Sequence, residues 1–338
     1  MTDDRPRALF HDPDLLRHPH DALVKRIFTR PEAAAVELRA MLPTALCEQL
    51  DWSTLRVEPA SFVDERLRSR HSDILYSLRT KDDAREVLVY VLLDHQSTLD
   101  PMMAWRFLRY VTRVWERYER SHRPLDALPL VMPLLLYQGP AGWTAPRRLS
   151  ELLDVPPQLD RAFPTPVELV FAVDELNETI VDDGLAAEEF VALVESTRAL
   201  LRYAKFSDPP TSAADPRIRA LGAQLDLVRE RLGVEVLQTL LVYLLTAYRP
   251  RSGNLHDILL DSASKETRQM FTSMRDELIA EGRSEGMATM IVQLLRRRGL
   301  AVDDATRARV LGCSDETQLE RWFDRAVTAS SVEQLFDS

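Results

Sequence analysis

Cysteine is scarce in this chain of 338 residues, and the two that occur, Cys47 and Cys313, form neither a CxxC pair nor a cluster with histidine. A disulfide framework and a zinc knuckle are therefore not expected, and the cysteine usage fits a reducing cytoplasm. The two most apolar segments, 128–137 and 236–248, are too short to span a bilayer. The N-terminal stretch MTDDRPRALFHDPD is charged and lacks the apolar core of a signal peptide. We expect a cytoplasmic protein with no membrane partner.

Basic residues are also fewer than acidic ones, and the formal net charge is -10. An even distribution of this charge would argue against a nucleic-acid partner, because binding to phosphates relies on Lys and Arg. Residues 1–150, however, contain 22 Lys plus Arg against 21 Asp plus Glu, whereas residues 151–338 contain 21 against 32. Any contact with a polyanion is therefore expected in the N-terminal half.

The hydrophobic pattern predicts an α/β organisation for the N-terminal half. Helical periods of three and four give way to runs rich in β-branched and aromatic residues, and a long helical segment and another apolar run follow. Asp100 and Pro101 are good N-cap and first-position residues for that long helix. The predicted order is helix (19–28 and 31–42), strand (54–63), strand (71–78), strand (86–94), helix (101–121) and strand (128–139).

Beyond residue 150 the pattern becomes mainly helical. A proline-rich connection over 151–180 contains one more apolar run, 167–176, which predicts an edge strand. Helical periodicity then dominates, and two glycines weaken the tract at about 262–298. The helices are predicted at 184–206, 216–233, 234–248 and about 262–298, with two short amphipathic helices within 315–336. We accordingly divide the chain into regions 15–150, 151–180, 181–260 and 261–338.

The stretch VLVYVLLDHQSTLD, residues 87–100, places polar groups at the end of a buried strand. Side chains two apart share a face of a strand, so Asp94 and Gln96 project to one side and His95 to the other. A short connection would bring Asp73, at the start of the preceding strand, near the same end. Two carboxylates and the backbone carbonyl of His95 would form the oxygen-rich site that Mg²⁺ prefers, and Gln96 could orient a bound water.

Spacing alone also allows a simpler interpretation of these residues. Aspartates at strand ends are common turn-formers and caps. The same caution applies to His71 and Tyr137, and to His20 and Asp21, since a His-Asp pair in PHDAL is typical of the start of a helix. On spacing alone, both interpretations stay open.

A set of five motifs, in order along the chain, resembles one known family. The motifs HDALVKRIF, RHSDILYSL, VYVLLDHQS, LPLVMPLLLYQGPAGW and DRAVTASSVEQLF resemble those of the Rpn family of recombination-promoting nucleases, also labelled "putative transposases". The resemblance covers roughly residues 15–335. It implies membership of the PD-(D/E)XK nuclease superfamily, with a restriction-endonuclease-like core of α-β-β-β-α-β order and a mixed sheet, followed here by a mainly helical region.

The resemblance also implies roles for individual residues. Asp73 corresponds to the first metal-binding aspartate, Asp94 stands where the family usually has glutamate, and Gln96 stands where many superfamily members have lysine. Tyr137 begins a Tyr-Gln-Gly sequence where relatives usually have Tyr-His-Gly. The implied cofactor is Mg²⁺ or another divalent cation such as Mn²⁺ or Ca²⁺. The residues implied as possible supporting groups are His20, Asp21, His71 and Tyr137.

The long helix after the candidate site carries arginines three or four residues apart. Such spacing lines one helix face, which is either a DNA-phosphate contact or a solvated face partly neutralised by Glu116 and Glu119. The face consists of Arg106, Arg109, Arg113, Arg117 and Arg120. No base-reading motif accompanies it, so cleavage with little sequence specificity is expected.

The function indicated by these patterns is that of a Mg²⁺-dependent DNA endonuclease acting in recombination or in the processing of mobile-element DNA. The alternative is a catalytically weak or inactive DNA-binding or regulatory protein that keeps the fold. A transposase is a third interpretation, and the sequence shows no three-acid strand-exchange pattern for it. A homodimer is expected, and the acidic helical half could bind a protein partner.

Overall fold

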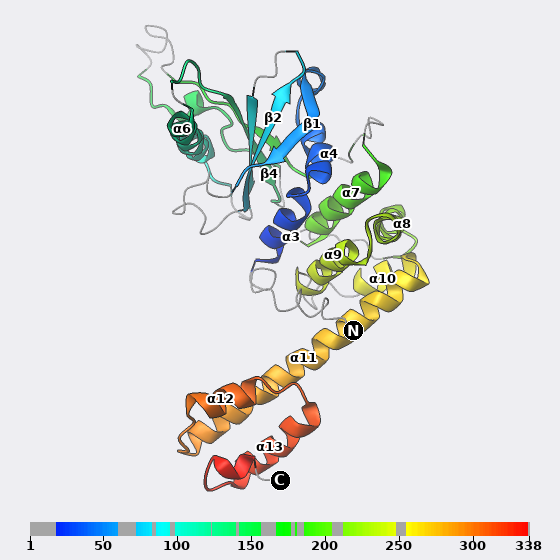
Figure 1. The fold of residues 1–338 in the computed structure, drawn as a ribbon. Coiled ribbons are helices and arrows are strands. Elements are labelled where there is room, and N and C mark those ends of the chain that lie inside the picture. The colour runs from blue at the N-terminus through cyan, green and yellow to red at the C-terminus, as the bar shows by residue number, and fades with distance from the viewer. Residues whose placement is uncertain are drawn as a thin grey trace. The chain divides into compact units, whose positions relative to one another are not determined.

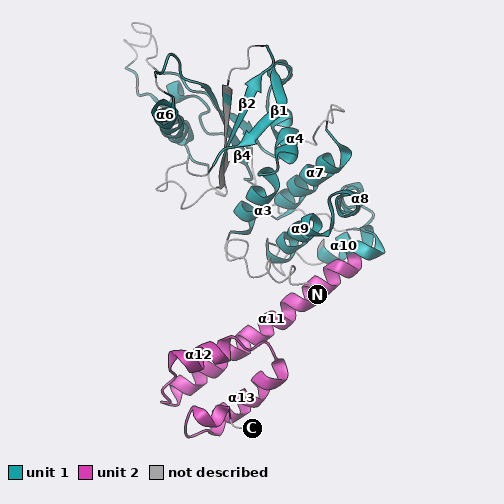
Figure 2. Cartoon of the chain, in the orientation of Figure 1, with its two compact units in different colours: residues 1–267 teal, residues 268–338 magenta. Residues whose placement is uncertain are grey.

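The computed structural model describes most of the chain as two compact units, residues 1–267 and 268–338 (Figure 2). For residues 72–73, 86, 88–94 and 255 it describes the backbone alone. The described residues are 18–59, 72–82, 86–94, 99–122, 124–139, 142–156, 167–176, 180, 186–204, 212–247 and 255–336.

Within the described residues, one mixed sheet organises the first unit (Figure 1). Its strands are adjacent in chain order, with β1, β2 and β3 antiparallel and β3, β4 and β5 parallel. Parallel neighbours need a crossover connection, and α6 (Met103–Ser121) supplies it between β3 and β4. The strands are β1 (Leu50–Val57), β2 (Ser72–Thr80), β3 (Glu86–Asp94), β4 (Leu130–Tyr137) and β5 (Ala172–Asp174).

Alternation along β2 shows which helices cover which face of the sheet. Leu75 belongs to the hydrophobic cluster that includes Phe107 of α6. Tyr76, the next residue, points to the other face, where its hydroxyl donates a 2.8 Å hydrogen bond to the carbonyl oxygen of Phe28 at the end of α3. Helix α6 therefore covers one face of the sheet, and the N-terminal helices α3 (Pro19–Phe28) and α4 (Pro31–Met41) cover the other (Figure 1). The short helix α5 (Thr44–Cys47) leads into β1.

Four more helices complete the first unit, and α7 and α9 pack against the N-terminal helices. Helices α8 and α10 approach each other closely at Gly222, where an added Cβ would lie 2.6 Å from the Ser262 hydroxyl oxygen. Any larger residue at Gly222 would force these helices apart. The four helices are α7 (Glu188–Tyr203), α8 (Pro216–Leu232), α9 (Val234–Ala247) and α10 (Leu255–Ser262).

The second unit is helical throughout its described residues. Most of the long helix α11 (Lys265–Arg297) belongs to it, followed by α12 (Asp304–Leu311), α13 (Glu316–Thr328) and a 3-10 turn at Glu333–Leu335. Its core is formed by apolar side chains of these elements, among them Ile291, Leu295, Leu319 and Trp322. In the described part of the chain, no helix is long and apolar enough to cross a membrane.

The predicted elements occur in the predicted order, but several of their bounds were wrong. The first strand was predicted at 54–63 and lies at Leu50–Val57, with Leu50 and Leu55 buried. Helix α6 begins at Met103 rather than Pro101, because the Asp100 carboxylate accepts a 2.9 Å bond from the Met102 amide and holds a turn ahead of the helix.

In the C-terminal part the pattern also missed or shortened elements. The two glycines of the 262–298 tract, Gly282 and Gly286, do not interrupt α11. Of the two short helices predicted within 315–336, one is α13 and the other is only a 3-10 turn. Helices α10 and α12 were not predicted. The four regions proposed from the sequence stay predictions.

Candidate active site

The strand register brings the backbones of the two candidate metal ligands to the same end of the sheet. Asp73 in β2 pairs with Leu92 of β3, two residues before Asp94. Asp94, the last residue of β3, pairs in turn with Tyr137, the last residue of β4. Diagonal neighbours of this kind in antiparallel strands lie about 7–8 Å apart. The two aspartate backbones are therefore close enough for one cation to lie between them.

The third predicted ligand and two other predicted site residues lie outside the described part of the chain. Gln96, the carbonyl of His95, and His71 are not among the described residues, and Asp73 and Asp94 are described by backbone only. Among the described side chains, no group of three or more His, Cys, Asp or Glu residues could hold a metal ion. The metal site and the roles of Asp73, Asp94 and Gln96 stay predictions.

Tyr137 lies in the core beside this end of the sheet. Its side chain is buried against Trp143, with ring centroids 5.1 Å apart in an edge-on arrangement. The ring also lies over Gly139, where an added Cβ would come within 1.8 Å of the Tyr137 hydroxyl oxygen. A packing role thus explains both Tyr137 and the glycine two residues later, and a supporting catalytic role for Tyr137 stays a prediction.

His20 makes a contact that its position next to Asp21 did not predict. Both residues lie in the first turn of α3, so the His-Asp pair does occur at the start of a helix. In addition, His20 Nδ1 is hydrogen-bonded to the buried hydroxyl of Tyr243 in α9 at 2.7 Å. Because 223 residues separate His20 from Tyr243, no local pattern could have indicated this pair.

Gln138 connects the end of β4 to the helical region. It follows Tyr137 directly, is 3% exposed, and donates a hydrogen bond to the Leu201 carbonyl oxygen of α7. It also interacts with the Tyr243 hydroxyl, whose pKa burial raises well above the ordinary value. Gln138 is therefore a buried polar link between β4, α7 and α9.

The arginines of α6 differ in their exposure. Arg106 is committed to Asp100 through a 2.9 Å ion pair, and its side chain is only 19% exposed. Arg109 and Arg120 are exposed, whereas Arg113 and Arg117 are half-buried. The arginine face of α6 thus borders the buried side of the helix. Of its two exposed members, Arg109 is the one closer along the chain to the candidate metal ligand Asp94.

A second cluster of charges, which sequence analysis missed, lies between the sheet and the helices. Arg198 of α7 forms a 2.7 Å ion pair with Glu37 of α4 and a two-pronged ion pair with Asp174 of β5. All three side chains are buried, with 5%, 6% and 12% of their surface exposed, respectively. This Glu37–Arg198–Asp174 triad ties a helix on one face of the sheet to its edge strand and to the helical region.

One cation cannot neutralise two buried carboxylates, so the triad retains a proton. Burial, opposed by Arg198 and reinforced by Asp174, raises the pKa of Glu37 to about 8. Burial would also raise the pKa of Asp174, but its hydrogen bonds with Arg198 and the Arg198 charge outweigh burial and lower that pKa. At neutral pH the triad is therefore an arginine, an aspartate and a protonated glutamate.

A Glu37→Gln variant is expected to flatten the pH dependence of folding stability. An unfolded chain releases this proton near the ordinary pKa of 4.5, whereas the folded chain keeps it until about pH 8. Between these values the folded state binds more protons, so stability falls as pH rises, by at most about 1.4 kcal/mol per pH unit. Glutamine mimics the protonated form and does not titrate.

The measurement is urea denaturation of both proteins at several pH values. The variant should gain stability relative to the parent as pH rises through this window. Asp174 does not titrate within this pH window, because its pKa lies below the ordinary value of 3.8. Parallel pH profiles for the two proteins would contradict a proton held on Glu37.

Comparison with known proteins identifies the family of this mixed, mostly helical fold. Residues 18–205, more than half of the chain, match the family described as "Putative transposase, YhgA-like". The chain belongs to this family, and its resemblance to the Rpn nucleases is confirmed by its similarity to proteins of that name. No solved structure matches the chain.

Three curated relatives illustrate the range of the family. The recombination-promoting nuclease RpnD of Escherichia coli O157:H7 is 42% identical over 129 residues, 37% of this chain and 48% of that protein. The recombination-promoting nuclease RpnC of Escherichia coli (strain K12) is 39% identical over 124 residues, 36% of this chain and 40% of that protein. The inactive recombination-promoting nuclease-like protein RpnE of the same strain is 34% identical over 229 residues, 67% and 70% of the two chains. The matches thus span about half or less of two of these relatives, and named nucleases and a named inactive protein are both similar to this chain.

Proposed function

We propose that the chain is a Mg²⁺-dependent DNA endonuclease of the Rpn type, with a PD-(D/E)XK site formed by Asp73, Asp94 and Gln96. The observation that carries the proposal is the register of β2 and β3, which sets Asp73 one diagonal step from Asp94. The names of RpnD and RpnC supply the reaction class.

The pleat of the sheet supports a shared site for the two carboxylates. Asp73 lies two residues before Leu75 in β2, and Leu75 packs on the side of the sheet that α6 covers. Asp94 is paired with Tyr137, which packs on that side as well. Alternation along the strands would then direct both aspartates to the face that α6 covers. Two carboxylates and a backbone carbonyl are a donor set that suits Mg²⁺.

Each residue has a distinct role in the proposed hydrolysis. The cation, when bound, lowers the pKa of a coordinated water and offsets the charge that develops on the phosphate. Asp73 and Asp94 hold it at the strand ends. Gln96 orients the attacking water through its amide, and it cannot ionise, so it acts as a positioning residue rather than a base. Arginines of α6 neutralise DNA phosphates beside the site.

Plasmid cleavage by the purified full chain tests this proposal. We expect cleavage with Mg²⁺, and its loss with EDTA and in an Asp73→Ala variant. Asp82→Ala is a matched control, because Asp82 is an exposed carboxylate in the turn at the other end of the same hairpin, and it should cleave like the parent. Absence of cleavage with Mg²⁺, Mn²⁺ and Ca²⁺ while DNA binding persists would reject the nuclease.

That outcome would favour the second candidate, a DNA-binding or regulatory protein without efficient chemistry. One observation favours this candidate: RpnE, named inactive, matches 67% of the chain. The resemblance to Rpn nucleases also implies glutamate at the position of Asp94, and many superfamily members have lysine at that of Gln96. The expected homodimer and the protein partner of the acidic half have no support beyond the sequence and stay predictions.

An Arg109→Gln variant is expected to weaken DNA binding uniformly across sequences. Each phosphate contact that is lost lowers the slope of log affinity against log salt by about 0.9. Fluorescence anisotropy with a short duplex at several salt concentrations measures the slope. Arg231→Gln serves as the control, since Arg231 is exposed at the end of α8. An unchanged slope for Arg109→Gln would mean that this arginine belongs to a solvated face.

A further inference from the structure

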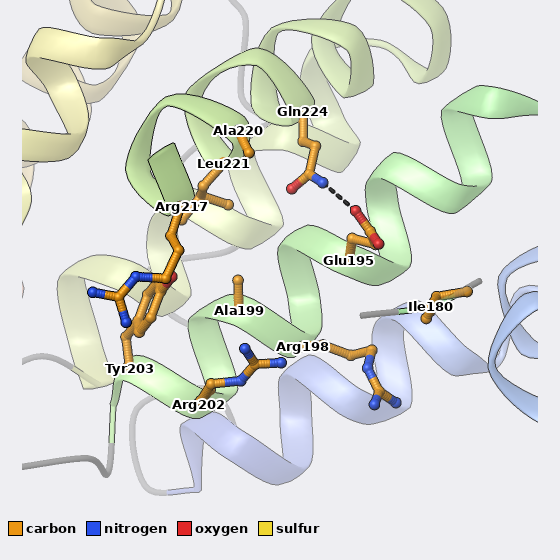
Figure 3. Close-up of a pocket in the computed structure, with 10 residues that line it drawn as sticks. All are labelled: Ile180, Glu195, Arg198, Ala199, Arg202, Tyr203, Arg217, Ala220, Leu221 and Gln224. Atoms are coloured by element: carbon orange, nitrogen blue, oxygen red, sulfur yellow. Dashed lines mark hydrogen bonds between the residues drawn. The ribbon is translucent and has the colours of Figure 1, made fainter. Parts of the chain in front are cut away.

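A cavity of about 150 Å³ lies between α7 and α8, apart from the strands that carry the candidate metal ligands (Figure 3). Its lining is rich in cationic and polar side chains, including Arg198, Arg202, Tyr203 and Arg217. This space can hold several water molecules or a single tetrahedral oxyanion.

The three arginines of the lining differ in how they are satisfied. Arg198 is turned toward α4 and β5, where Glu37 and Asp174 bind it. Arg217 is paired with Asp215, the N-cap of α8, at 2.6 Å. The Nε atoms of Arg198 and Arg202 are both buried without a hydrogen-bond partner among the described residues, but the other guanidinium nitrogens of Arg198 bind Glu37 and Asp174. A buried donor without an acceptor is costly, so a ligand that supplies an acceptor would be favoured.

The charge around Arg202 favours an anion as that ligand. Burial, together with the nearby charges of Arg198 and Arg217, lowers the pKa of Arg202, although Tyr203 and Asp174 act in the opposite direction. Glu195 is the carboxylate of the lining, and it accepts a hydrogen bond from Gln224 at the end of the cavity away from Tyr203 (Figure 3). The lining contains three cations and one carboxylate, and two of the cations, Arg198 and Arg217, are also paired with carboxylates that lie outside the lining.

We propose that this cavity binds a phosphate-sized oxyanion, with Arg202 and Arg217 as the charged donors and the Tyr203 hydroxyl as a neutral donor. Guanidinium groups match the oxygen geometry of phosphate through paired hydrogen bonds. Arg202 and Tyr203 are consecutive at the end of α7, and Arg217 lies in the first turn of α8. An oxyanion between them would join the two helices, and its source is either inorganic phosphate or a terminal phosphate of a nucleic acid.

Calorimetric titration of the full chain with inorganic phosphate, at constant ionic strength set with chloride, tests this site. We expect saturable binding that weakens at least about 10-fold in Arg202→Gln and is partly restored in Arg202→Lys, which keeps the charge but not the fork. Arg219→Gln is the matched control, because Arg219 is an exposed arginine of α8 that is absent from the lining. Its affinity should equal that of the parent. Circular dichroism checks that each variant is folded.

A second arm identifies the source of the oxyanion. A short oligonucleotide with a 5′-phosphate, compared with the same strand lacking it, should compete with inorganic phosphate only if terminal phosphates enter the cavity. Competition by the phosphorylated strand alone, or by neither strand, supports the site and assigns its source. Phosphate binding that equals that of chloride, or that is unchanged in Arg202→Gln, would overturn the proposal. None of these readouts depends on cleavage.

Discussion

Replacing Arg198 with methionine is expected to lower the free energy of unfolding of the first unit by about 3–5 kcal/mol, the usual cost of removing one partner of a buried ion pair. The substitution leaves Glu37 and Asp174 buried without the cation that both of them bind. Methionine fills a similar length of side chain, so most of the loss is electrostatic. Urea denaturation of the full chain, followed by circular dichroism at neutral pH, measures the change.

The control for this substitution is Arg231→Met, at an exposed position of α8. Surface substitutions of this kind usually change stability by less than about 0.5 kcal/mol. Adding Glu37→Gln and Asp174→Asn to Arg198→Met should recover part of the lost stability, because the buried charge of Asp174 is then removed and position 37 can no longer ionise. A loss below about 1 kcal/mol in Arg198→Met would show that the triad contributes little to the fold.

Variants at Asp94 are expected to have the largest effect on chemistry. Asp94→Asn keeps the size of the side chain and removes its charge, and we expect DNA cleavage to fall at least about 100-fold, since changes even to residues behind metal ligands cost 10–100-fold. Asp94→Glu introduces the acid that the resemblance to Rpn nucleases implies at this position. It should bind metal and cleave at least as fast as the parent.

Plasmid cleavage rates and calorimetric titration with Mn²⁺ check these expectations together. Asp126→Asn is a suitable control, because Asp126 is an exposed carboxylate in the loop before β4. If Asp94→Asn keeps both metal affinity and cleavage, Asp94 is a strand-end residue and not a ligand. If Asp94→Glu cleaves and the parent does not, the shorter side chain is what limits this protein.

The local hydrophobic pattern correctly predicted a central strand and one of the helices that cover the sheet. The predicted strand 86–94 coincides with β3, and the helix predicted at 19–28 coincides with α3. Both have strong apolar periodicity and clear polar ends. The first strand was misplaced, because Leu50 and Leu55 are buried while a register shift separates Asp51 from Arg56, so the alternation is irregular. Helix α12 was missed because its short sequence DATRARVL has a weak apolar face.

The candidate site was less predictable than the fold that positions it. The register of β2 and β3 follows from two antiparallel strands that are adjacent in the chain, and it sets the backbone of Asp73 near that of Asp94. Contacts between distant segments have no local signal: 161 residues separate Glu37 from Arg198. The sequence did contain one clue, namely charged residues inside apolar runs, such as Glu37 in AAAVELRAM and Arg198 in VALVESTRALL. Charges in such positions are rarely buried unless they are paired.

The position of the triad bears on how proteins of this kind diverge. Its three members come from α4, α7 and β5, whereas the candidate metal ligands lie on β2 and β3. Selection for a folded chain therefore acts on one set of side chains, and selection for the proposed hydrolysis would act on another. Substitutions at the second set can accumulate without producing a misfolded protein, and a descendant that has lost its chemistry can persist as an intact scaffold open to a different use.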